Sequence, residues 1–418
     1  MCPVETLQAL YDGGGGASLA DYMAAIEDSP NGGGLFIWEM VDEAIARTDK
    51  GGELDPSGTR SCDGIVGPHH ELEASYFAAR DIFSPVQVEN APAASVRKMG
   101  RVTLQNKFHD TDLNQCRFVR ELVKCPSPTD RTWFKPVVNS AQLPAPSAAP
   151  GGTAMLDLKL PGSPGDFDYV KLAAYGPDDI LLREWSWPMC ERASYMPVTA
   201  AKDKLSVNEA GGQIKVKAGE LSFTFDAATA RLIEARRDNT ILPLRNGPDI
   251  AWAASTGSAI PQQLRDGVAR ADEGKVKQGG ENSKPAKNDA TTIRLATAPL
   301  GTSGAQVVKH SDRIEIFQNN ARGFNRLSWN IFADGTLSLD YSYKLTGTFD
   351  SFGISFDSDE PAMKSVTWLG QAPNPVWKNR LEGGTFGFWS KDYADTEPGR
   401  VWNYPYFKGC HWDTVWFR

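Results

Sequence analysis

The chain has 418 residues, of which 44 are lysine or arginine and 52 are aspartate or glutamate, giving a formal net charge of −8 at pH 7. This mildly acidic balance, without any basic run, argues against a nucleic-acid partner. No apolar segment approaches the ~20 residues that a membrane-spanning helix needs, and the first residues lack the basic and apolar regions of a signal peptide. We therefore expect a soluble protein of roughly two to four domains that has no membrane partner; its compartment stays open.

The cysteines and histidines do not predict a metal site. The 5 histidines include only one adjacent pair, His69 and His70, whose side chains we expect to diverge. The cysteines have no paired metal-ligand spacing, and a reduced protein or one with an incidental disulfide would look alike; they are Cys2, Cys62, Cys116, Cys125, Cys190 and Cys410. The 12 tryptophans and 39 glycines favour a largely all-β body with an aromatic-rich surface.

The first 85 residues alternate between strand and helix patterns. A helix is predicted from Leu19, with Ser18 as its N-cap, to the turn at residues 29–32, and a second over residues 72–83, ended by Pro85. An apolar strand precedes each helix, so the predicted order is β-α-β-α, which is typical of part of a parallel α/β layer. A closed eight-fold barrel needs about 250 residues, so residues 1–85 are predicted to be the carboxyl-terminal part of a larger barrel.

The stretch from Gly33 to Glu43, GGLFIWEMVDE, is the most informative in this region. A continuous apolar run bounded by glycine suits a strand that is covered on both faces, as in a parallel sheet. Trp38 and acidic residues follow at its carboxyl end, where an α/β barrel keeps its reactive side chains. Asp42 and Glu43 can line a pocket or form salt bridges at the rim, and the sequence does not decide between these roles.

From Val86 the pattern becomes all-β. Short strands separated by turn residues over about 100 positions predict an immunoglobulin-like β-sandwich at residues 86–200, with a Pro/Ala-rich loop at 143–152. Its predicted strands cover residues 102–108, 118–123, 156–160, 170–175 and 181–187.

A second all-β domain is predicted at residues 201–418, large enough for an incomplete two-sheet supersandwich. Strict alternation at 214–216 and 221–225 predicts an antiparallel hairpin, and residues 271–290 are polar enough to be a mobile excursion. The remaining predicted strands cover residues 231–233, 313–317, 327–332 and 337–345. The chain stops inside a strand-like run.

Several motifs together resemble glycoside hydrolase family 2, the β-galactosidase family. The GGLFIWEMVDE stretch resembles the family's last barrel strand, and DGIVGP at 63–68 with FSPV at 83–86 resembles its exit from the barrel. Far downstream, WLGQAP at 368–373 with WKNR at 377–380 is similar to the small-chain supersandwich motif, and FKG at 407–409 with residues 412–416 resembles a later strand. Ala372 stands where the motif usually has glycine, which puts the local turn in doubt.

This resemblance implies a retaining, exo-acting β-glycosidase that hydrolyses O-glycosidic bonds. The family's nucleophile lies in a Glu-x-x-His pattern, and Glu5 occupies the matching place; a plain surface acid remains the other interpretation of Glu5. Gln8 replaces the histidine, so it keeps hydrogen-bonding capacity but cannot carry charge. Trp38, Gln8 and Asp12 are the expected substrate-binding residues, with the Trp38 indole covering the sugar face.

The family's general acid lies on an earlier strand that this sequence does not contain. Without a proton donor the leaving group loses a contribution typically worth 10²–10⁴-fold, so we expect no activity from the chain alone. The family's metal ligands lie mostly upstream as well, and neither a metal nor any other cofactor is expected. Residues 377–380 can approach the active-site mouth or pack between sheets.

Two functional hypotheses from different classes follow. In the first, the chain is the carboxyl-terminal portion of a family 2 glycosidase with a carbohydrate substrate, such as a β-galactoside, and with a missing amino-terminal portion. In the second, it is a non-catalytic carbohydrate-binding or scaffold module. A separate amino-terminal chain would show itself as activity that appears only on mixing.

Overall fold

The computed structural model of the chain is mostly β-strand, with three α-helices in its described part. The structure describes residues 3, 6, 16, 18–55, 63–128, 130, 135–161, 166–190, 205–253, 294–296, 303–343, 351–376, 381–392 and 410–418. Two compact units result: one takes in Met1–Met196, Ser365–Trp402 and Lys408–Arg418, the other Pro197–Lys364 and Asn403–Phe407. No helix among these described ranges is long and apolar enough to cross a membrane.

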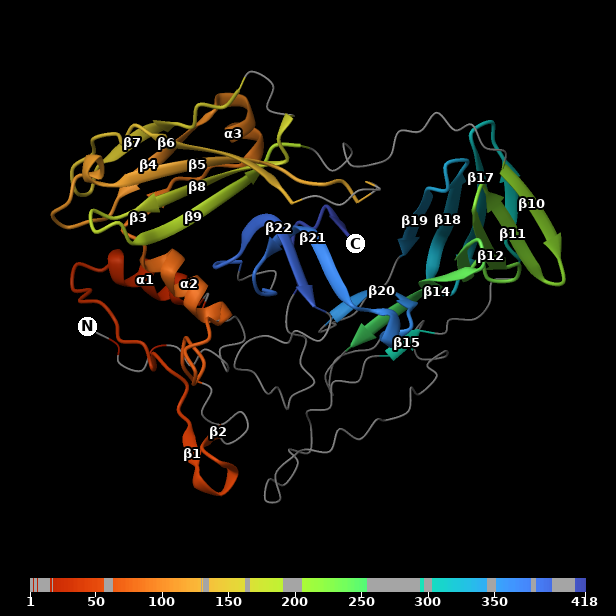
Figure 1. Ribbon diagram of the computed structural model, residues 1–418, viewed down its shortest axis with the longest axis horizontal. Coiled ribbons are helices and arrows are strands. Elements are labelled where there is room, and N and C mark those ends of the chain that lie inside the picture. Colours follow the sequence, from red (N-terminus) through yellow and green to blue (C-terminus); the bar gives the residue numbers. More distant parts are fainter. Residues whose placement is uncertain are drawn as a thin grey trace. The chain divides into compact units, whose positions relative to one another are not determined.

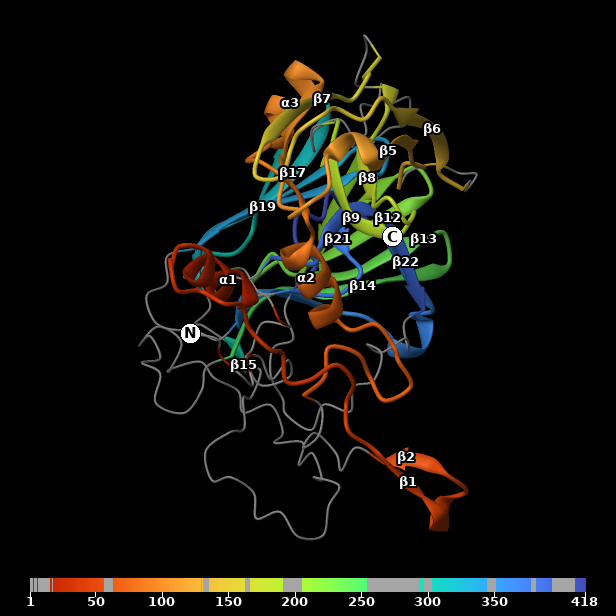
Figure 2. The same cartoon turned by 90° about the vertical axis from the view of Figure 1, so that its left-hand side faces the viewer.

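Both helices predicted for the amino-terminal segment are present and lie beside each other in the first unit (Figure 1). They are α1 (Leu19–Glu27) and α2 (Ala74–Phe83). The Ser18 side chain does not cap α1; instead the Leu19 N–H donates to the Gly16 carbonyl at 3.1 Å. Between the helices a small hairpin projects away from them in both views (Figures 1 and 2); it joins β1 (Ile45–Arg47), the 3-10 turn η1 (Thr48–Lys50) and β2 (Glu53–Asp55).

The predicted partial barrel is not supported by the described residues. Only two isolated parallel bridges occur there, Thr6 with Ile37 and Val41 with Val66, and no parallel sheet forms among the described residues. The expectation that residues 33–41 are covered on both faces is wrong. Leu35, Ile37 and Val41 pack against the helices, whereas three alternating side chains stay exposed on the other side: Phe36 (64%), Trp38 (41%) and Met40 (60%).

An antiparallel sandwich follows, as the alternating pattern predicted (Figure 1). One sheet has the order β3-β4-β7, and the other β6-β5-β8-β9. The elements are β3 (Val86–Val88), α3 (Ala93–Met99), β4 (Arg101–Asn106), the 3-10 turn η2 (Leu113–Gln115), β5 (Arg117–Lys124), β6 (Val137–Leu143), β7 (Thr153–Asp157), β8 (Tyr169–Tyr175) and β9 (Leu181–Pro188). Inward-facing residues of both sheets, such as Leu104 and Phe118, share one core, and residues 143–152 connect β6 to β7 as the predicted loop.

A third sheet of the first unit comes from the end of the chain. Its order is β22-β21-β23, made of β21 (Ser365–Ala372), β22 (Thr385–Asp392) and β23 (Trp416–Phe417). Leu369, Phe386 and Trp416 pack against Val123 and Cys125 at the end of β5. A hydrophobic contact therefore ties the carboxyl-terminal sheet to the sandwich.

The second unit consists of two sheets that share a core. The first has the order β10-β11-β12-β13-β14-β15 with β20 paired to β14, and the second β16-β17-β18-β19. Their bounds are β10 (Leu205–Ala210), β11 (Gln213–Ala218), β12 (Leu221–Asp226), β13 (Leu232–Arg237), β14 (Thr240–Ala253), β15 (Arg294–Ala296), β16 (Gln306–Lys309), β17 (Arg313–Ala321), β18 (Phe324–Phe332), β19 (Leu337–Tyr343) and β20 (Ser351–Asp357), with a 3-10 turn η5 (Glu360–Ala362). The predicted hairpin is β11–β12, and the excursion at 271–290 lies outside the described residues.

One fully buried polar side chain organises the β4 end of the sandwich. Asn106 donates to the carbonyls of Thr111 and Ala148, both at 2.8 Å, and accepts from the Phe108 N–H at 2.9 Å. Since buried backbone groups need partners, this amide replaces sheet hydrogen bonds where the strand ends.

We predict that Asn106→Ala destabilises the first unit by about 2–4 kcal/mol, because it leaves backbone groups without partners in the interior. Urea unfolding followed by tryptophan fluorescence measures this change. Asn114→Ala, at an exposed position of η2, is the matched control and should change stability by less than about 0.5 kcal/mol. Equal effects of the two substitutions would contradict this role of Asn106.

Candidate functional site

Three of the four residues predicted from the sequence to form a site, Glu5, Gln8 and Asp12, lie outside the described residues. The neighbour of Glu5 is described: the Thr6 N–H donates to the Phe36 carbonyl at 2.9 Å, and the Trp38 N–H donates to the Thr6 carbonyl at 3.3 Å. The backbone at Thr6 thus runs parallel to and beside the Trp38 segment. The meeting of Glu5 and Trp38 side chains stays a prediction.

Trp38, the fourth predicted residue, has an accessible indole. Side chains alternate along this extended stretch, so Ile37 faces the helices while Trp38 shares the opposite side with Phe36 and Met40. The peptide bond between Trp38 and Glu39 is cis. An exposed indole on an open face can stack on a planar or ring-shaped apolar surface.

Asp42 takes a role that the sequence did not suggest. Its side chain is 3% exposed, and its Oδ1 accepts from the Gly64 N–H at 2.9 Å. Its own N–H donates to the Val66 carbonyl at 2.9 Å. Asp42 therefore anchors the loop at 63–66 to the Trp38 segment.

Two neighbouring carboxyl groups have raised pKa values. Burial raises the pKa of Glu39, and the nearby charges of Glu43 and Asp63 raise it further. Burial and the Glu43 charge likewise raise the pKa of Asp63. One carboxyl oxygen of Glu39 and one of Asp63 are buried and have no hydrogen-bond partner among the described residues. Carboxyl groups in such surroundings keep their protons to higher pH and can act as proton donors.

Gly64 allows the two segments to approach this closely. A Cβ at that position would lie 2.5 Å from the Val41 carbonyl carbon and would also collide with the Asp42 nitrogen. Only glycine fits there, because the obstructing atoms belong to the backbone. Within the described ranges, no group of three histidine, cysteine, aspartate or glutamate side chains is arranged to hold a metal ion.

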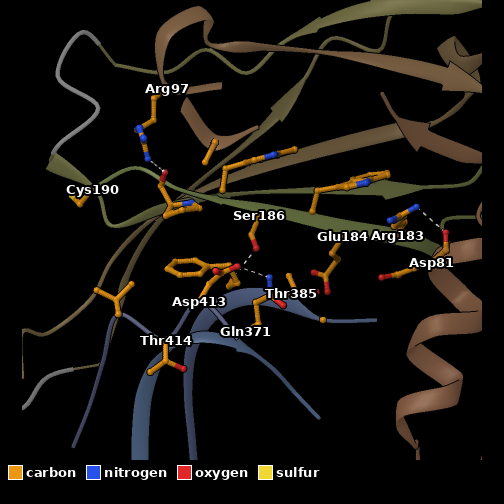
Figure 3. A pocket seen from close by; sticks show the side chains of 17 residues that line it. Asp81, Arg97, Arg183, Glu184, Ser186, Cys190, Gln371, Thr385, Asp413 and Thr414 are labelled. Carbon is orange, nitrogen blue, oxygen red and sulfur yellow. Dashed lines mark hydrogen bonds between the residues drawn. The ribbon is translucent and has the colours of Figure 1, made fainter. Parts of the chain in front are cut away.

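A cleft that sequence reasoning did not find lies along β9 and has a volume of about 690 Å³ (Figure 3). Its other walls come from α3, from the β21–β22 sheet and from the loop before β23. Ser186 and Glu184 point from β9 toward Gln371 and Asp413 (Figure 3). The sequence pattern Trp185-Ser186-Trp187 on β9 predicts an ordinary strand and gives no signal of a cleft.

Hydrogen bonds fix the walls of this cleft. Ser186 Oγ donates to the Phe386 carbonyl at 2.6 Å, and Gln371 Nε2 donates to Asp413 Oδ2 at 2.9 Å. Arg97 Nη1 donates to the Pro188 carbonyl at 3.1 Å. The walls of the cleft are therefore connected to one another by hydrogen bonds.

At one end of the cleft, Arg183 of β9 connects to α2. Its guanidinium donates to the Asp81 carbonyl at 2.8 Å and to Gln87 Oε1. The Asp81 carboxylate pairs with Arg80 at 3.0 Å, yet burial outweighs this attraction and that of Arg183, so the Asp81 pKa is raised. Burial lowers the pKa of Arg183.

Comparisons with known proteins do not identify a family for this chain. No protein-family model and no curated protein sequence matches it. Among solved structures, it is similar to the exo-chitosanase of Amycolatopsis orientalis, solved in complex with PNP-β-D-glucosamine. The identity is 9% and the TM-score 0.19, over 55% of this chain and 25% of that one. The chain thus spans about a quarter of that protein, and a TM-score of this size supports no argument about fold or function.

We predict that Gly64→Ala destabilises the first unit by about 1–3 kcal/mol, because the new Cβ must displace the backbone at residues 41–42. Urea unfolding measures this loss. Gly353→Ala, in the second unit, is the control for a glycine replacement without a clash, since no atom of the described residues beyond its chain neighbours lies within 4 Å of a Cβ built there. A Gly64→Ala variant as stable as this control would contradict the close approach.

We also predict that Glu39→Gln raises the melting temperature at pH 7 but not well below pH 4.5. A carboxyl group with a pKa raised above its ordinary 4.5 binds more protons when folded, so stability is lost as pH rises through the folded-state pKa. The glutamine side chain does not ionise, so the variant does not lose this stability as the pH rises. Thermal unfolding across this pH range checks it, with exposed Glu209→Gln as control; a gain that is independent of pH would refute the mechanism.

Proposed function

We propose that this chain is the carboxyl-terminal portion of a retaining, exo-acting β-glycosidase of glycoside hydrolase family 2, and that it is inactive by itself. In this proposal residues 1–85 end a barrel, 86–200 form the immunoglobulin-like sandwich and 201–418 the incomplete supersandwich. The observation that carries it is the parallel bridge between Thr6 and Ile37, since it joins the two stretches that resemble adjacent barrel strands.

The direction of the side chains supports the same proposal. Thr6 is 5% exposed, and its bridge partner Ile37 packs against the helices. Successive side chains of an extended strand face opposite sides, so the proposal requires Glu5 to face the side on which Trp38 is exposed. A nucleophile beside an aromatic platform is what a retaining glycosidase needs at the sugar-binding end of its barrel.

The exposed face of residues 36–40 favours a glycosidase portion over a self-contained module. Phe36, Trp38 and Met40 lie on one side of an extended stretch that has two parallel bridge partners and carries its packing helices on the other side. Contiguous exposed apolar groups of this kind mark a surface that another element covers. We propose that further barrel strands, in an amino-terminal portion, cover it and supply the general acid.

The proposed chemistry needs two carboxyl groups about 5–5.5 Å apart. Glu5 would attack the anomeric carbon while the missing acid protonates the leaving oxygen, and water would then release the sugar from the enzyme. Trp38 would stack on the sugar ring, and Gln8 and Asp12 would bind its hydroxyls. None of these steps requires a cofactor.

We predict that the purified 418-residue chain does not hydrolyse aryl β-galactosides, β-glucuronides or β-mannosides, because the proposal places the general acid in the amino-terminal portion. Release of the aryl alcohol is the measurement, with a complete family 2 enzyme as positive control. Turnover that Glu5→Gln abolishes would show a self-sufficient active site and overturn the claim of inactivity. Turnover unchanged in Glu5→Gln would overturn the assignment of Glu5.

A further inference from the structure

The outer edge of β9 is not used by the proposed function. In the sheet order β6-β5-β8-β9, this strand has a neighbouring strand on one side only. Every residue from Arg183 to Pro188 lines the cleft described above, although successive side chains of a strand face opposite sides of the sheet. The cleft therefore follows the edge of the strand, where main-chain groups point outward.

The pairing of β9 with β8 shows which main-chain groups point into the cleft. The Met189 N–H donates to the Asp168 carbonyl at 2.7 Å, just beyond the end of β9. In an antiparallel pair, positions that exchange hydrogen bonds alternate with positions that do not. Counting back from Met189 in the register of β8 and β9, positions 187, 185 and 183 bond to β8, whereas positions 188, 186 and 184 turn their main-chain groups to the cleft.

Pro188 agrees with this register. Proline has no N–H to donate, so within a sheet it is found where the missing N–H faces away from the neighbouring strand. Its carbonyl accepts from Arg97 Nη1, which reaches it from α3 at 3.1 Å. The main-chain N–H and carbonyl groups of Glu184 and Ser186 have no hydrogen-bond partner among the described residues. An added strand can bond to these groups.

The two walls of the cleft carry opposite charges, with Arg97 on one side of β9 and Asp413 on the other (Figure 3). Arg97 donates to a neutral carbonyl, and the Asp413 carboxylate accepts from the neutral Gln371 amide at 2.9 Å. Neither residue forms an ion pair within the part of the chain that the structure describes. Because an amide and a carbonyl have no net charge, both charges remain available to a ligand.

An extended peptide matches the edge and both walls. Its main chain offers N–H and carbonyl groups at the spacing of a strand, and its successive side chains point to opposite sides. A side chain opposite Glu184 or Ser186 lies on the side of Asp413, and the next side chain lies on the side of α3 and Arg97. A basic residue next to an acidic one therefore complements the two walls.

We propose that the outer edge of β9 is a docking site for an extended peptide segment of a partner protein. The segment adds a strand beside Glu184 and Ser186 and places adjacent basic and acidic side chains near Asp413 and Arg97. The inference does not depend on the proposed glycosidase function, because strand addition here does not require Glu5.

The test is saturable binding of a fluorescein-labelled hexapeptide, TVKEVT, to the full 418-residue chain, measured by fluorescence anisotropy. Threonine and valine favour an extended main chain. The peptides TVQEVT and TVKQVT each lack one charge and should bind about twofold to fivefold more weakly, since exposed ion pairs contribute little. No saturable binding of TVKEVT, or equal binding of all three peptides, would overturn the proposal.

N-methylation of the peptide tests strand addition directly. Only alternate N–H groups of an extended peptide face the neighbouring strand. We compare TVKEVT methylated on its odd-numbered nitrogens with TVKEVT methylated on its even-numbered ones. One of the two should bind at least about tenfold more weakly, because it loses main-chain hydrogen bonds, and the other should bind nearly as before. Equal binding of the two methylated peptides would refute an added strand.

Asp413→Asn tests one wall of the site. The substitution keeps the shape of the side chain, and asparagine tolerates the positive φ of 51° at this position. Binding of TVKEVT should weaken about twofold to fivefold, and binding of TVQEVT should not change, because the lost partner is the lysine. Asp110→Asn, an exposed position of the same unit outside the cleft, is the matched control and should leave both peptides unaffected.

Glu184→Pro tests the strand edge. Proline removes the N–H that faces the cleft and leaves the bonds to β8 intact, so peptide binding should weaken about threefold to tenfold relative to Glu184→Ala, which loses only the side chain. Unchanged binding in both Asp413→Asn and Glu184→Pro would place the peptide elsewhere. A dimer of the chain that the peptide does not dissociate, seen by sedimentation velocity, would assign the edge to a second copy and overturn the proposal.

Discussion

The guanidinium of Arg183 donates to the Asp81 carbonyl where α2 meets β9, and the rest of the first unit is arranged around that strand. From the same strand Ser186 reaches the Phe386 carbonyl of β22, and Trp187 Nε1 donates to the Ala91 carbonyl at 2.8 Å. β9 thus contacts α2, the segment between β3 and α3, and the carboxyl-terminal sheet. Because these contacts are polar and directional, they fix orientation in a way that apolar packing alone does not.

The amino-terminal segment has a different balance of forces. Its apolar side chains divide between a side that packs on α1 and α2, through Ile37 and Val41, and a side that exposes Phe36 and Trp38. The first side gives the segment its local order. The second side leaves apolar side chains exposed to solvent. The proposed function therefore includes further strands of a larger protein that cover them.

Buried charge is handled in two ways in this unit. Around Trp38, Glu39 and Asp63 have raised pKa values because burial and nearby carboxylates act in the same direction. Along β9, cations stand beside the carboxylates, so Asp81 has Arg80 and Glu184 has Lys171. The first arrangement favours the protonated carboxyl groups, and the second favours their ionised forms.

The local patterns of the sequence determined the elements: period-two alternation at residues 214–225 gave the β11–β12 hairpin, and the helical repeat ending at Pro85 gave α2. The motif at 33–43 also predicted a strand with a sugar-binding face. Only the tertiary structure decided which face of that stretch is covered, that Asp42 anchors Gly64, and that Gln371 and Ser186 line one cleft. Those facts depend on contacts between residues far apart in the chain, such as Ser186 with Phe386, and periodicity reports only on neighbours.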